Sequence, residues 1–383
     1  MVAGHLQEKK GLFYIVLSYY DEFEKRKTKW LPTGLPVKGN KKRAEAMLME
    51  QRRTFDPENK PVDGDILFAD YMEKWLEIIK SSIQKTTYSS YSNMVKGVIA
   101  PYFRKRKITL GNLQASDIQD FYTEQLKRVK ASSVIHYHAN IHKALKYAFK
   151  TDLIPQNPAD KIERPKKERF TGSFYDSEEI NQLFEAAKGD LLELPILFGA
   201  FYGLRRSEVI GLKWDAIDFV NDTIIIRHTV TTCNLDGKSV TIASDSTKTK
   251  SSMRTLPLIP AFKSKLLAHQ QAQEENRRLC GRSYCKQYLD YICVDGMGNL
   301  IKPGYVTAAF PAFLKNNGLR KIRYHDLRHS CASLLLANGV PMKQIQEWLG
   351  HSDFSTTANV YAHLDYNSKI SSAAALVSGL SLE

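Results

Sequence analysis

The sequence predicts a mainly α-helical chain with small β-sheets, an α+β fold in three parts. Apolar residues recur at helical spacing through most of residues 66–159 and again in much of the C-terminal half. Short β-branched and aromatic runs occur near the N-terminus and between residues 222 and 258, which indicates strands there. Two stretches rich in proline and charge, DPENKPVDGD and IPQNPADKIERPKKERF, separate the parts. We therefore expect domains at residues 1–58, 65–160 and 173–383.

The first part is predicted to be a small unit of strands and one helix. LFYIVLSYY is β-branched and aromatic, and KRKTKWLPTG follows as a second strand with a basic face. NKKRAEAMLMEQRRTF then has the apolar spacing of a helix. A strand of cations interleaved with an aromatic residue fits the major groove of DNA, although protective lysines on a solvated edge strand give the same pattern. The candidate DNA-binding residues here are Lys25, Arg26, Lys27 and Lys29.

The second part is predicted to be helical throughout. LFADYMEKWLEIIK, TTYSSYSNMVKGVIAPYF, ASDIQDFYTEQLKRV and SSVIHYHANIHKALKYAFK each place apolar residues on one helical face. The stretch FRKRKIT lies between the second and third of these helices. Its consecutive cations suit contact with the phosphates of a duplex. The candidate DNA-binding residues are Arg104, Lys105, Arg106 and Lys107.

The third part mixes helices and strands. SEEINQLFEAAK and LLELPILFGAFYGL are predicted helices, and DTIIIRHTVTT, SVTIAS and RTLPL are predicted strands. Helices are expected again at AFKSKLLAHQQAQEENRRL, VTAAFPAFLKNNG, HDLRHSCASLLLANG, PMKQIQEWLG and STTANVYAH. This part is therefore predicted to be mostly helical with a few short strands.

Composition and charge favour a nucleic-acid partner. The 383 residues are 43% hydrophobic, enough for real cores, and carry a formal net charge of +14. Ribosome-associated and membrane-surface proteins share such charge, but no apolar run approaches a membrane span and the N-terminus lacks a signal-peptide layout. The sequence thus predicts a cytoplasmic protein. The five cysteines lack zinc-ligand spacing, so free thiols rather than a zinc site are expected. No metal and no cofactor are predicted.

Four polar features stand out in the third part. In YGLRRSEVIGL, Gly203 is predicted to end one helix, and Arg205 to Glu208 begin the next, where backbone amides also favour an anion. DSTKTKSSMRTLPL has the polar character of a hairpin tip with Lys248 and Lys250 pointing outward.

The other two features lie near the C-terminus. In YHDLRHS, His325 and Arg328 are three residues apart and share a helical face. LGHSDFSTTANVYAH carries His351 and Tyr361. Taken singly, each of these residues is ordinarily structural or solvated, and a lone tyrosine is ordinarily half buried.

Together the four features supply the groups that phosphoryl transfer on DNA needs without a metal. Two guanidiniums grip phosphate oxygens in fork geometry, which lysine does less well. Imidazoles donate further hydrogen bonds and handle the proton of the nucleophile. A lysine protonates the leaving oxygen, and a tyrosine forms an ester that stores the bond energy for the reverse step.

The motifs GLRRSE, KTK, HDLRHS, LGHS and STTANVYAH, in this order, resemble the tyrosine recombinase (phage integrase) family. The resemblance is close in the third part. The helical part resembles the core-binding domain of that family, and the first part its arm-type DNA-binding domain, a three-stranded sheet with a helix, found in integrases of conjugative transposons and temperate phages. The third part corresponds to the catalytic domain.

The resemblance implies a role for each motif residue. Arg205 and Arg328 grip the scissile phosphate, His325 hydrogen-bonds it and assists proton transfer, and His351 completes the phosphate pocket. Lys248 protonates the departing 5′ oxygen, and Tyr361 attacks to form a 3′-phosphotyrosine. Glu208 is implied to orient the site rather than to react.

Some points of the motif match leave alternatives open. Lys250 competes with Lys248 as the general acid, and Arg206 directly follows Arg205. Tyr202 stands where the family most often has threonine. Tyr366 lies close to Tyr361 but lacks the preceding STTANV pattern.

The resemblance implies a site-specific integrase and excision enzyme that exchanges strands through a Holliday junction without ATP or metal. Its implied partners are double-stranded DNA with core-type and arm-type sites, three further copies of the chain in a tetramer, an accessory excision factor and a host DNA-bending protein. The tail SKISSAAALVSGLSLE is implied to dock on a neighbouring protomer, and the alternative is that it caps its own subunit. The rival functions are a type IB topoisomerase-like activity, which needs no arm domain, and a DNA-binding regulator that does not cut.

Overall fold

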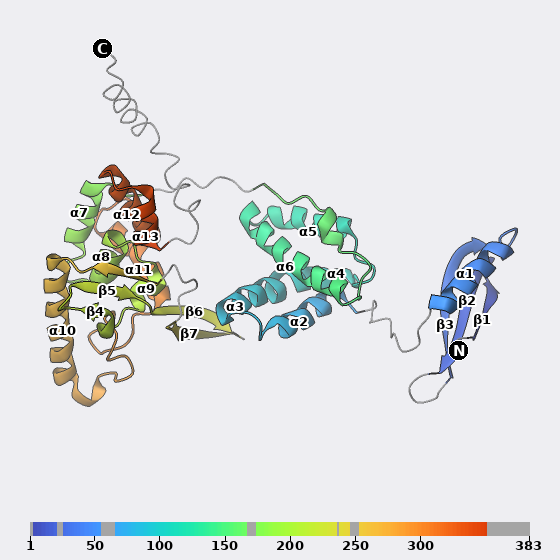
Figure 1. Ribbon diagram of the computed structural model, residues 1–383, viewed down its shortest axis with the longest axis horizontal. Coiled ribbons are helices and arrows are strands. Elements are labelled where there is room, and N and C mark those ends of the chain that lie inside the picture. Colours follow the sequence, from blue (N-terminus) through green and yellow to red (C-terminus); the bar gives the residue numbers. More distant parts are fainter. Residues whose placement is uncertain are drawn as a thin grey trace, which may run out of the picture. The chain divides into compact units, whose positions relative to one another are not determined.

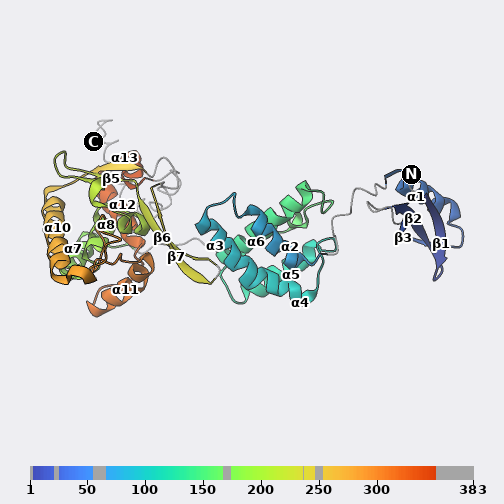
Figure 2. The ribbon, with the colours of Figure 1, turned by 90° about the horizontal axis from the view of Figure 1, so that it is seen from below.

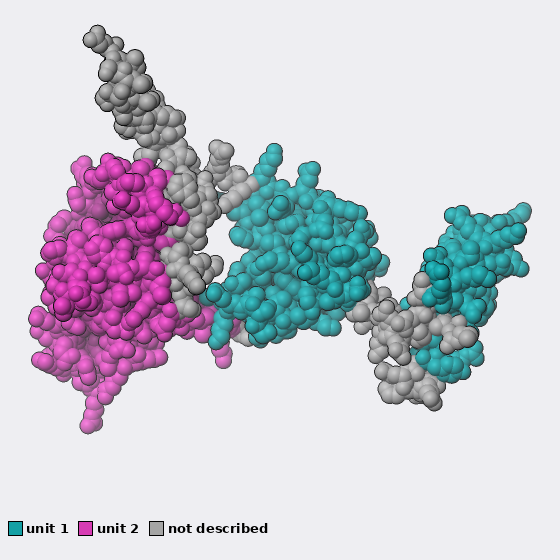
Figure 3. Space-filling model, in the orientation of Figure 1, with its two compact units in different colours: residues 1–168 teal, residues 169–383 magenta. Residues whose placement is uncertain are grey.

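The computed structural model describes residues 3–20, 26–54, 66–166, 174–235, 237–245 and 253–350. The chain divides into two units, Met1–Glu168 and Arg169–Glu383 (Figure 3). Helices dominate, and the paired strands are antiparallel (Figure 1). The predicted mainly helical fold with small sheets is therefore confirmed. No helix in the described ranges is long and apolar enough to cross a membrane.

A three-stranded sheet with one helix is formed by residues 3–54. Its elements are β1 (Ala3–Lys9), β2 (Leu12–Tyr20), β3 (Arg26–Pro36) and α1 (Lys41–Thr54), with strand order β1-β2-β3. Ile15 and Leu17 of β2 are buried, and a Cβ atom on Gly4 would lie 2.8 Å from Leu17 and 3.1 Å from Leu48 of α1. Helix α1 thus covers the face of the sheet that carries Leu17. No residue pattern singled out β1, and β3 runs past the predicted strand end.

The basic residues of β3 lie on two different faces of this sheet. The register places Lys29 opposite Leu17 and Trp30 opposite Val16. Because side chains alternate along a strand, Lys27 and Lys29 lie on the α1 side, whereas Arg26 and Trp30 lie on the open side. A basic face was predicted for this strand, and Lys27 and Lys29 share one, whereas Arg26 falls on the opposite face. Lys25 lies outside the described residues.

The next part of the first unit is helical. Its helices are α2 (Phe68–Ile79), α3 (Lys85–Met94), α4 (Ala100–Arg106), α5 (Ala115–Leu126) and α6 (Ala131–Lys150). A π-helical turn, Val95–Ile99, joins α3 to α4. Pro101 follows it, and a proline lacks the amide that a regular helix would use, which explains why the predicted single helix is irregular here. Phe68 and Phe121 pack on either side of Phe103, with ring centroids 4.8 and 5.4 Å away.

The run of cations at residues 104–107 is not a connector between helices. Arg104 and Arg106 belong to the last turn of α4, and Lys107 adopts the left-handed conformation that ends it. Arg104 binds Asp70 at 2.7 Å and Glu73 at 3.0 Å, and Arg106 binds Glu124 at 3.0 Å. The prediction of a connector was wrong. The apolar spacing of α4 continues to Phe103, and the helix extends through the cations to Arg106.

His138 is a buried histidine at the centre of this helical part. Its ring is 2.8 Å from the Tyr122 hydroxyl and stacks on His142 at 5.5 Å between centroids. Burial first, and then the nearby charges of His142 and Arg164, lower the pKa of His138 to about 4. The imidazole is therefore neutral at neutral pH.

The stability of this helical part is expected to fall as the pH is lowered from about 6.5 to about 4. In this window the unfolded chain takes up a proton at His138 while the folded chain does not, so acid favours unfolding. The loss reaches about 3 kcal/mol. Urea unfolding, followed by the fluorine NMR signal of 5-fluorotryptophan at Trp75, measures it, because Trp75 is the only tryptophan of residues 66–166.

Two variants on α6 separate His138 from other acid effects. His138→Gln should flatten the pH dependence, whereas His136→Gln should retain it because His136 is exposed on the same helix. An unchanged slope in His138→Gln would show that other groups cause the acid sensitivity.

The second unit combines seven helices and two small sheets within its described residues. The helices are α7 (Ser177–Ala186), α8 (Glu193–Phe201), α9 (Arg206–Ile210), α10 (Pro260–Cys280), α11 (Pro303–Asn316), α12 (Asp326–Ala337) and α13 (Met342–Leu349). One sheet has the order β4-β5-β8, with β4 (Ile217–Asp218), β5 (Thr223–Ile226) and β8 (Arg254–Pro257). The other pairs β6 (Thr229–Leu235) with β7 (Lys238–Ser244), and it extends from the body of the unit (Figures 1 and 2).

The hairpin predicted around Lys248 and Lys250 does not join paired strands. The strand before this segment, β7, pairs with β6, while the strand after it, β8, pairs with β5. The hairpin is formed instead by β6 and β7, where Leu235 pairs with Lys238. The sequence between them is Asp-Gly, a strong turn signal that the sequence-based prediction overlooked. Residues 246–252, including both lysines, lie outside the described residues.

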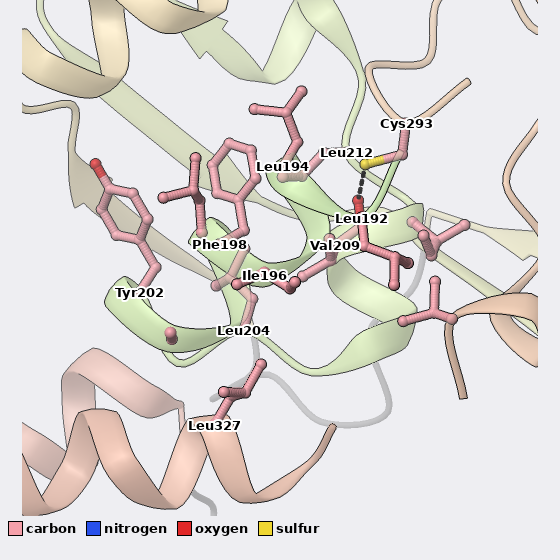
Figure 4. Close-up of a cluster of buried hydrophobic side chains, with 14 of the residues drawn as sticks. Leu192, Leu194, Ile196, Phe198, Tyr202, Leu204, Val209, Leu212, Cys293 and Leu327 are labelled. Atoms are coloured by element: carbon pink, nitrogen blue, oxygen red, sulfur yellow. Dashed lines mark hydrogen bonds between the residues drawn. The ribbon is translucent and has the colours of Figure 1, made fainter. Parts of the chain in front are cut away.

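A buried apolar core holds the second unit together around α8. Phe198 and Ile196 are fully buried, and Leu327 of α12 lies against α8 (Figure 4). The thiol of Cys293 donates to the Val209 carbonyl at 3.5 Å, which connects the C-terminal end of α9 to the same core. Full burial of a side chain such as Phe198 contributes about 2 to 3 kcal/mol. The core thereby fixes α8, α9 and α12, the elements that carry the predicted motif residues. All five cysteines are free.

Candidate active site

The chain turns sharply at Gly203, between α8 and α9. Gly203 has φ +62°, a conformation that favours glycine. The predicted helix end is confirmed, since α8 ends at Phe201 and α9 begins at Arg206. A Cβ atom on Gly203 would lie 2.4 Å from the Leu349 side chain of α13. The turn therefore brings the first motif directly against the last turn of α13.

Gly203→Ala is expected to lower the free energy of unfolding of the second unit by about 2 to 4 kcal/mol. About 1 to 2 kcal/mol comes from the left-handed backbone and the rest from the contact with Leu349. Gly189→Ala is the matched control, because Gly189 has φ +76° with nothing within 4 Å of its Cβ position. Urea unfolding followed at fluorinated Trp214 and Trp348 measures both variants. Equal losses would show that Leu349 moves aside without cost.

Arg205 and Glu208 close the N-terminal turn of α9 on each other. The Glu208 carboxylate accepts the Arg205 backbone amide at 2.9 Å and the Arg205 Nη1 at 2.6 Å. The sequence predicted that this helix start would favour a bound anion. In the structure the Glu208 carboxylate accepts the Arg205 backbone amide instead. The Arg205 guanidinium donates to Glu208 through Nη1 and to the Gly350 carbonyl through Nη2, the latter at 2.9 Å.

Glu208 is a buried carboxylate among arginines. Only 1% of its surface is exposed, and Arg254 Nη2 donates to its Oε2 at 3.0 Å. Burial alone would raise the pKa of Glu208, but the positive charges of Arg254, Arg205 and Arg328 outweigh burial and keep the pKa below its usual range. Glu208 is therefore ionised at neutral pH and compensates the arginine charges.

Arg328 lies on the first turn of α12 and is buried. Its Nη1 donates to the Gly203 carbonyl and its Nη2 to the Leu349 carbonyl, both at 2.6 Å. Burial, and then repulsion from Arg205, lower the pKa of Arg328 to about 9, so the guanidinium stays charged at neutral pH. The structure thus brings Arg205, Glu208 and Arg328 together, three residues that the motifs had singled out.

His325 precedes α12, three residues before Arg328. The protein atoms around its ring, followed by the neighbouring His329 and Arg328, lower the pKa of His325. His325 is exposed to solvent, which weakens these effects by screening. A neutral imidazole is favoured, able both to donate and to accept a hydrogen bond.

The remaining predicted catalytic residues lie outside the described residues. They are Lys248, His351 and Tyr361, together with the alternatives Lys250 and Tyr366. The described chain ends at Gly350, one residue before His351 in the sequence. Among the described residues no group of three His, Cys, Asp or Glu side chains is placed to hold a metal ion.

Sequence reasoning missed Arg254. The residue begins β8 in RTLPL, and only 7% of its side chain is exposed. It contacts Glu208, and its Nε donates to the Trp348 carbonyl at 2.8 Å. A single arginine at a strand start gives no sequence signal of burial, because both partners lie far away in the chain.

Arg205 and Arg328 supply two charged guanidiniums, and His325 precedes the helix that carries Arg328. This set of groups is suited to binding a phosphate diester. The second unit matches the model of the "Phage integrase family" over residues 173–368, and residues 67–126 match that of the "Phage integrase, N-terminal SAM-like domain". Fold and site define a site-specific DNA recombinase of the tyrosine type. The chain belongs to the phage integrase family, whose members include integrases of mobile genetic elements.

Curated relatives extend over most of the chain. A "Tyrosine recombinase XerC-like" protein of Caldanaerobacter subterraneus subsp. tengcongensis is 29% identical over 322 residues, 78% of this chain and 80% of that protein. The ICEBs1 integrase of Bacillus subtilis is 26% identical over 341 residues, 86% of this chain and 88% of that protein.

Solved structures share the fold. The Tn1549 transposon integrase in complex with a circular intermediate DNA has a TM-score of 0.66 at 17% identity, covering 81% of this chain and 99% of that one. A lambda integrase tetramer bound to a Holliday junction has a TM-score of 0.56 at 17% identity, covering 93% and 94%. At these identities the likeness is one of fold.

Proposed function

We propose that this recombinase integrates and excises a mobile element by cutting and rejoining DNA through a covalent bond to Tyr361. The observation that carries the proposal is the convergence of Arg205 and Arg328, which donate to the neighbouring carbonyls of Gly350 and Leu349. The buried Glu208 carboxylate pairs with Arg205, and its negative charge also favours the charged form of Arg328. Burial of two positive charges near each other is unfavourable. A phosphate bound by both guanidiniums would offset this unfavourable free energy.

The proposed cleavage step exchanges one ester for another. The Tyr361 oxygen attacks the phosphorus, the bond from phosphorus to the 5′ oxygen breaks, and a 3′-phosphotyrosine forms. The phenol proton leaves with the help of neutral His325, and Lys248 supplies a proton to the 5′ oxygen. Arg205, Arg328 and His351 hold the non-bridging oxygens, where negative charge increases in the transition state.

Rejoining is the same step in reverse. A 5′ hydroxyl from the partner duplex attacks the phosphotyrosine, the bond to Tyr361 breaks, and the new strand is sealed. One ester replaces another at each step, so the reaction needs no ATP. The guanidiniums supply the positive charge that a metal ion would otherwise supply. Exchange of one strand pair gives a Holliday junction, and exchange of the second resolves it.

The DNA is proposed to be held by three domains, at residues 1–58, 65–160 and 173–383. Core-type sites bind the two larger domains, and arm-type sites bind the small one through the open face of its sheet. Trp30 lies on that face. Its ring centroid is 6.3 Å from that of Tyr14 and 5.6 Å from Lys9 Nζ. The net charge of +14 favours all of these contacts.

Within the helical part, Arg104 and Arg106 form ion pairs with carboxylates of the same part, so the proposed DNA contact falls on the lysines beside them. Lys105 and Lys107 are exposed at the same end of α4, and no ion pair to them is seen in the described chain. We propose that these two lysines contact phosphates, while the two arginines stabilise the end of α4 through their ion pairs.

The active assembly is proposed to be a tetramer on two duplexes. A lambda integrase tetramer bound to a Holliday junction has this fold, which supports the assembly by analogy. The C-terminal tail, which lies outside the described residues, is proposed to dock on a neighbouring protomer. An accessory excision factor and a host DNA-bending protein complete the proposed partners. Because the proposed substrate is DNA, we place the reaction in the cytoplasm.

A covalent trap tests the proposed function. The protein is mixed in EDTA with a nicked duplex carrying the attachment site of its element, so that the short 5′ fragment diffuses away after cleavage. A denaturing gel should show a slow protein–DNA band, and mass spectrometry should place the DNA adduct on Tyr361. No band on a site that the protein demonstrably binds would favour a DNA-binding regulator instead.

A further inference from the structure

Three arginines bind the last carbonyls of α13. The carbonyl groups at the end of a helix lack partners within the helix and lie at the negative end of its dipole. Each of three consecutive carbonyls accepts from an arginine of a different segment. The pairs are Trp348 with Arg254 at 2.8 Å, Leu349 with Arg328 at 2.6 Å and Gly350 with Arg205 at 2.9 Å.

Arg254 is the member of this set that the proposed chemistry does not use. It comes from β8, and its guanidinium contacts both the end of α13 and Glu208. Nε faces the Trp348 carbonyl, while Nη2 lies 3.0 Å and Nη1 3.4 Å from the Glu208 carboxylate. One buried side chain therefore connects β8, α9 and the end of α13.

We propose that Arg254 is a positioning residue for strand cleavage, which fixes Glu208 and the last turn of α13 and through them places Arg205. This inference rests on the proposed function. The two side-chain anchors of Arg205 are Glu208 and the Gly350 carbonyl, and Arg254 holds the first directly and the second through the neighbouring carbonyl of Trp348. His351 follows Gly350 in the sequence, so the same contact fixes the point from which the chain continues to it.

Only arginine meets this geometry. The contact to Trp348 uses Nε and the contacts to Glu208 use the far end of the fork, so donors must point in two directions from one planar group. A lysine in its place keeps a positive charge near Glu208 but offers a single ammonium group. Arg254→Lys therefore separates the charge from the fork.

The test compares Arg254→Lys and Arg254→Met with the same changes at Arg320. Arg320 is a matched control, because it grips Glu179 with Nε at 2.6 Å and Nη2 at 2.7 Å in the same unit. Cleavage is measured in single turnover on the nicked duplex with protein in excess, DNA affinity by gel shift, and unfolding by heating. Both Arg254 variants should bind DNA within about threefold of the unchanged protein and cleave it about 10- to 100-fold more slowly, whereas Arg320 variants should cleave normally.

The pH profile of cleavage gives a readout that loss of stability alone would not move. In Arg254→Met, Glu208 loses its strongest charge partner, so its pKa rises and the acid limb of the profile moves to higher pH. In Arg254→Lys the remaining charge should restore the acid limb but not the rate. If Arg254→Met fails to fold, the lysine variant decides by its rate alone.

Three results would overturn the inference while the proposed function stands. Arg254 variants could cleave at the normal rate, or slow only as far as Arg320 variants of equal stability do. An equal loss of DNA affinity and cleavage would show that Arg254 contacts DNA rather than positions other groups. If the unchanged protein forms no adduct on a site it binds, the proposed function itself fails, and this inference fails with it.

Discussion

Replacing Arg328 by lysine is expected to slow strand cleavage by about 10²- to 10³-fold and to leave DNA binding nearly unchanged. Removal of one well-placed donor to a developing oxyanion typically has an effect of this size. Affinity depends on many phosphate contacts spread over the protein, so one buried residue contributes little to it. The change therefore separates the chemical step from binding.

The surroundings of Arg328 explain why lysine cannot replace it. Two of its nitrogens already donate to the Gly203 and Leu349 carbonyls, and the planar group leaves further donors in fixed directions. A lysine ammonium cannot occupy both carbonyls and still face a phosphate. Burial lowers the pKa of Arg328 to about 9, and the same burial would bring a lysine into the neutral range, where it loses its charge.

The measurement is single-turnover cleavage of the nicked duplex, with Tyr361→Phe defining zero and Arg320→Lys as the control for an arginine-to-lysine change elsewhere. Cleavage by Arg328→Lys should partly recover as the pH is lowered from about 8 to about 6, because its amine regains a proton. Parallel losses of binding and cleavage would instead make Arg328 a structural anchor.

Glu208→Gln is expected to lower the free energy of unfolding of the second unit by about 3 to 5 kcal/mol. Removing one partner of a buried ion pair leaves the other charge uncompensated, which has this cost. The variant keeps the shape of the side chain but removes the negative charge that Arg254 contacts and that favours the charged form of Arg328, and both arginines are nearly fully buried. Exposed pairs behave differently, and Glu179→Gln, whose partner Arg320 is about half exposed, should lose no more than about 1 kcal/mol.

The pH dependence of this difference provides an internal check. The folded-state pKa of Glu208 is depressed, so its stabilising contribution is complete above its ordinary value of 4.5 and is lost as the pH falls through the folded-state value. The gap between the unchanged protein and Glu208→Gln should therefore narrow below about pH 4.5 in urea unfolding experiments followed at fluorinated Trp348. A gap that stays constant would show that shape rather than charge is lost.

Local signals in the sequence were enough to predict the first motif and the helices. Gly203 ends α8 in the conformation that glycine favours, and Glu208 pairs with Arg205 three residues earlier, both of which depend on near neighbours. The cations at 104–107 were misplaced because helical spacing and a solvated connector look alike over four residues. The basic face of β3 could be predicted for Lys27 and Lys29, which are two residues apart, whereas Arg26 falls on the other face.

Non-local contacts could not be predicted in this way. Arg254 is buried only because β8 pairs with β5 and because α13 ends beside it, and neither fact is visible in RTLPL. The separation of β7 from β8 likewise follows from pairing with other strands. Strand pairing and helix docking depend on the whole core, so they decide which charged residues come together.

The row of carbonyls at the end of α13 also has an evolutionary consequence. Arg205, Arg254 and Arg328 all bind main-chain oxygen atoms, which every amino acid provides. The contacts therefore place no demand on the side chains at the helix end, and that sequence is free to diverge as far as packing allows. The arginines and Glu208 have no such freedom, because loss of one leaves the charges of the others unbalanced. Among related sequences, we expect these four residues to be kept or replaced as a set.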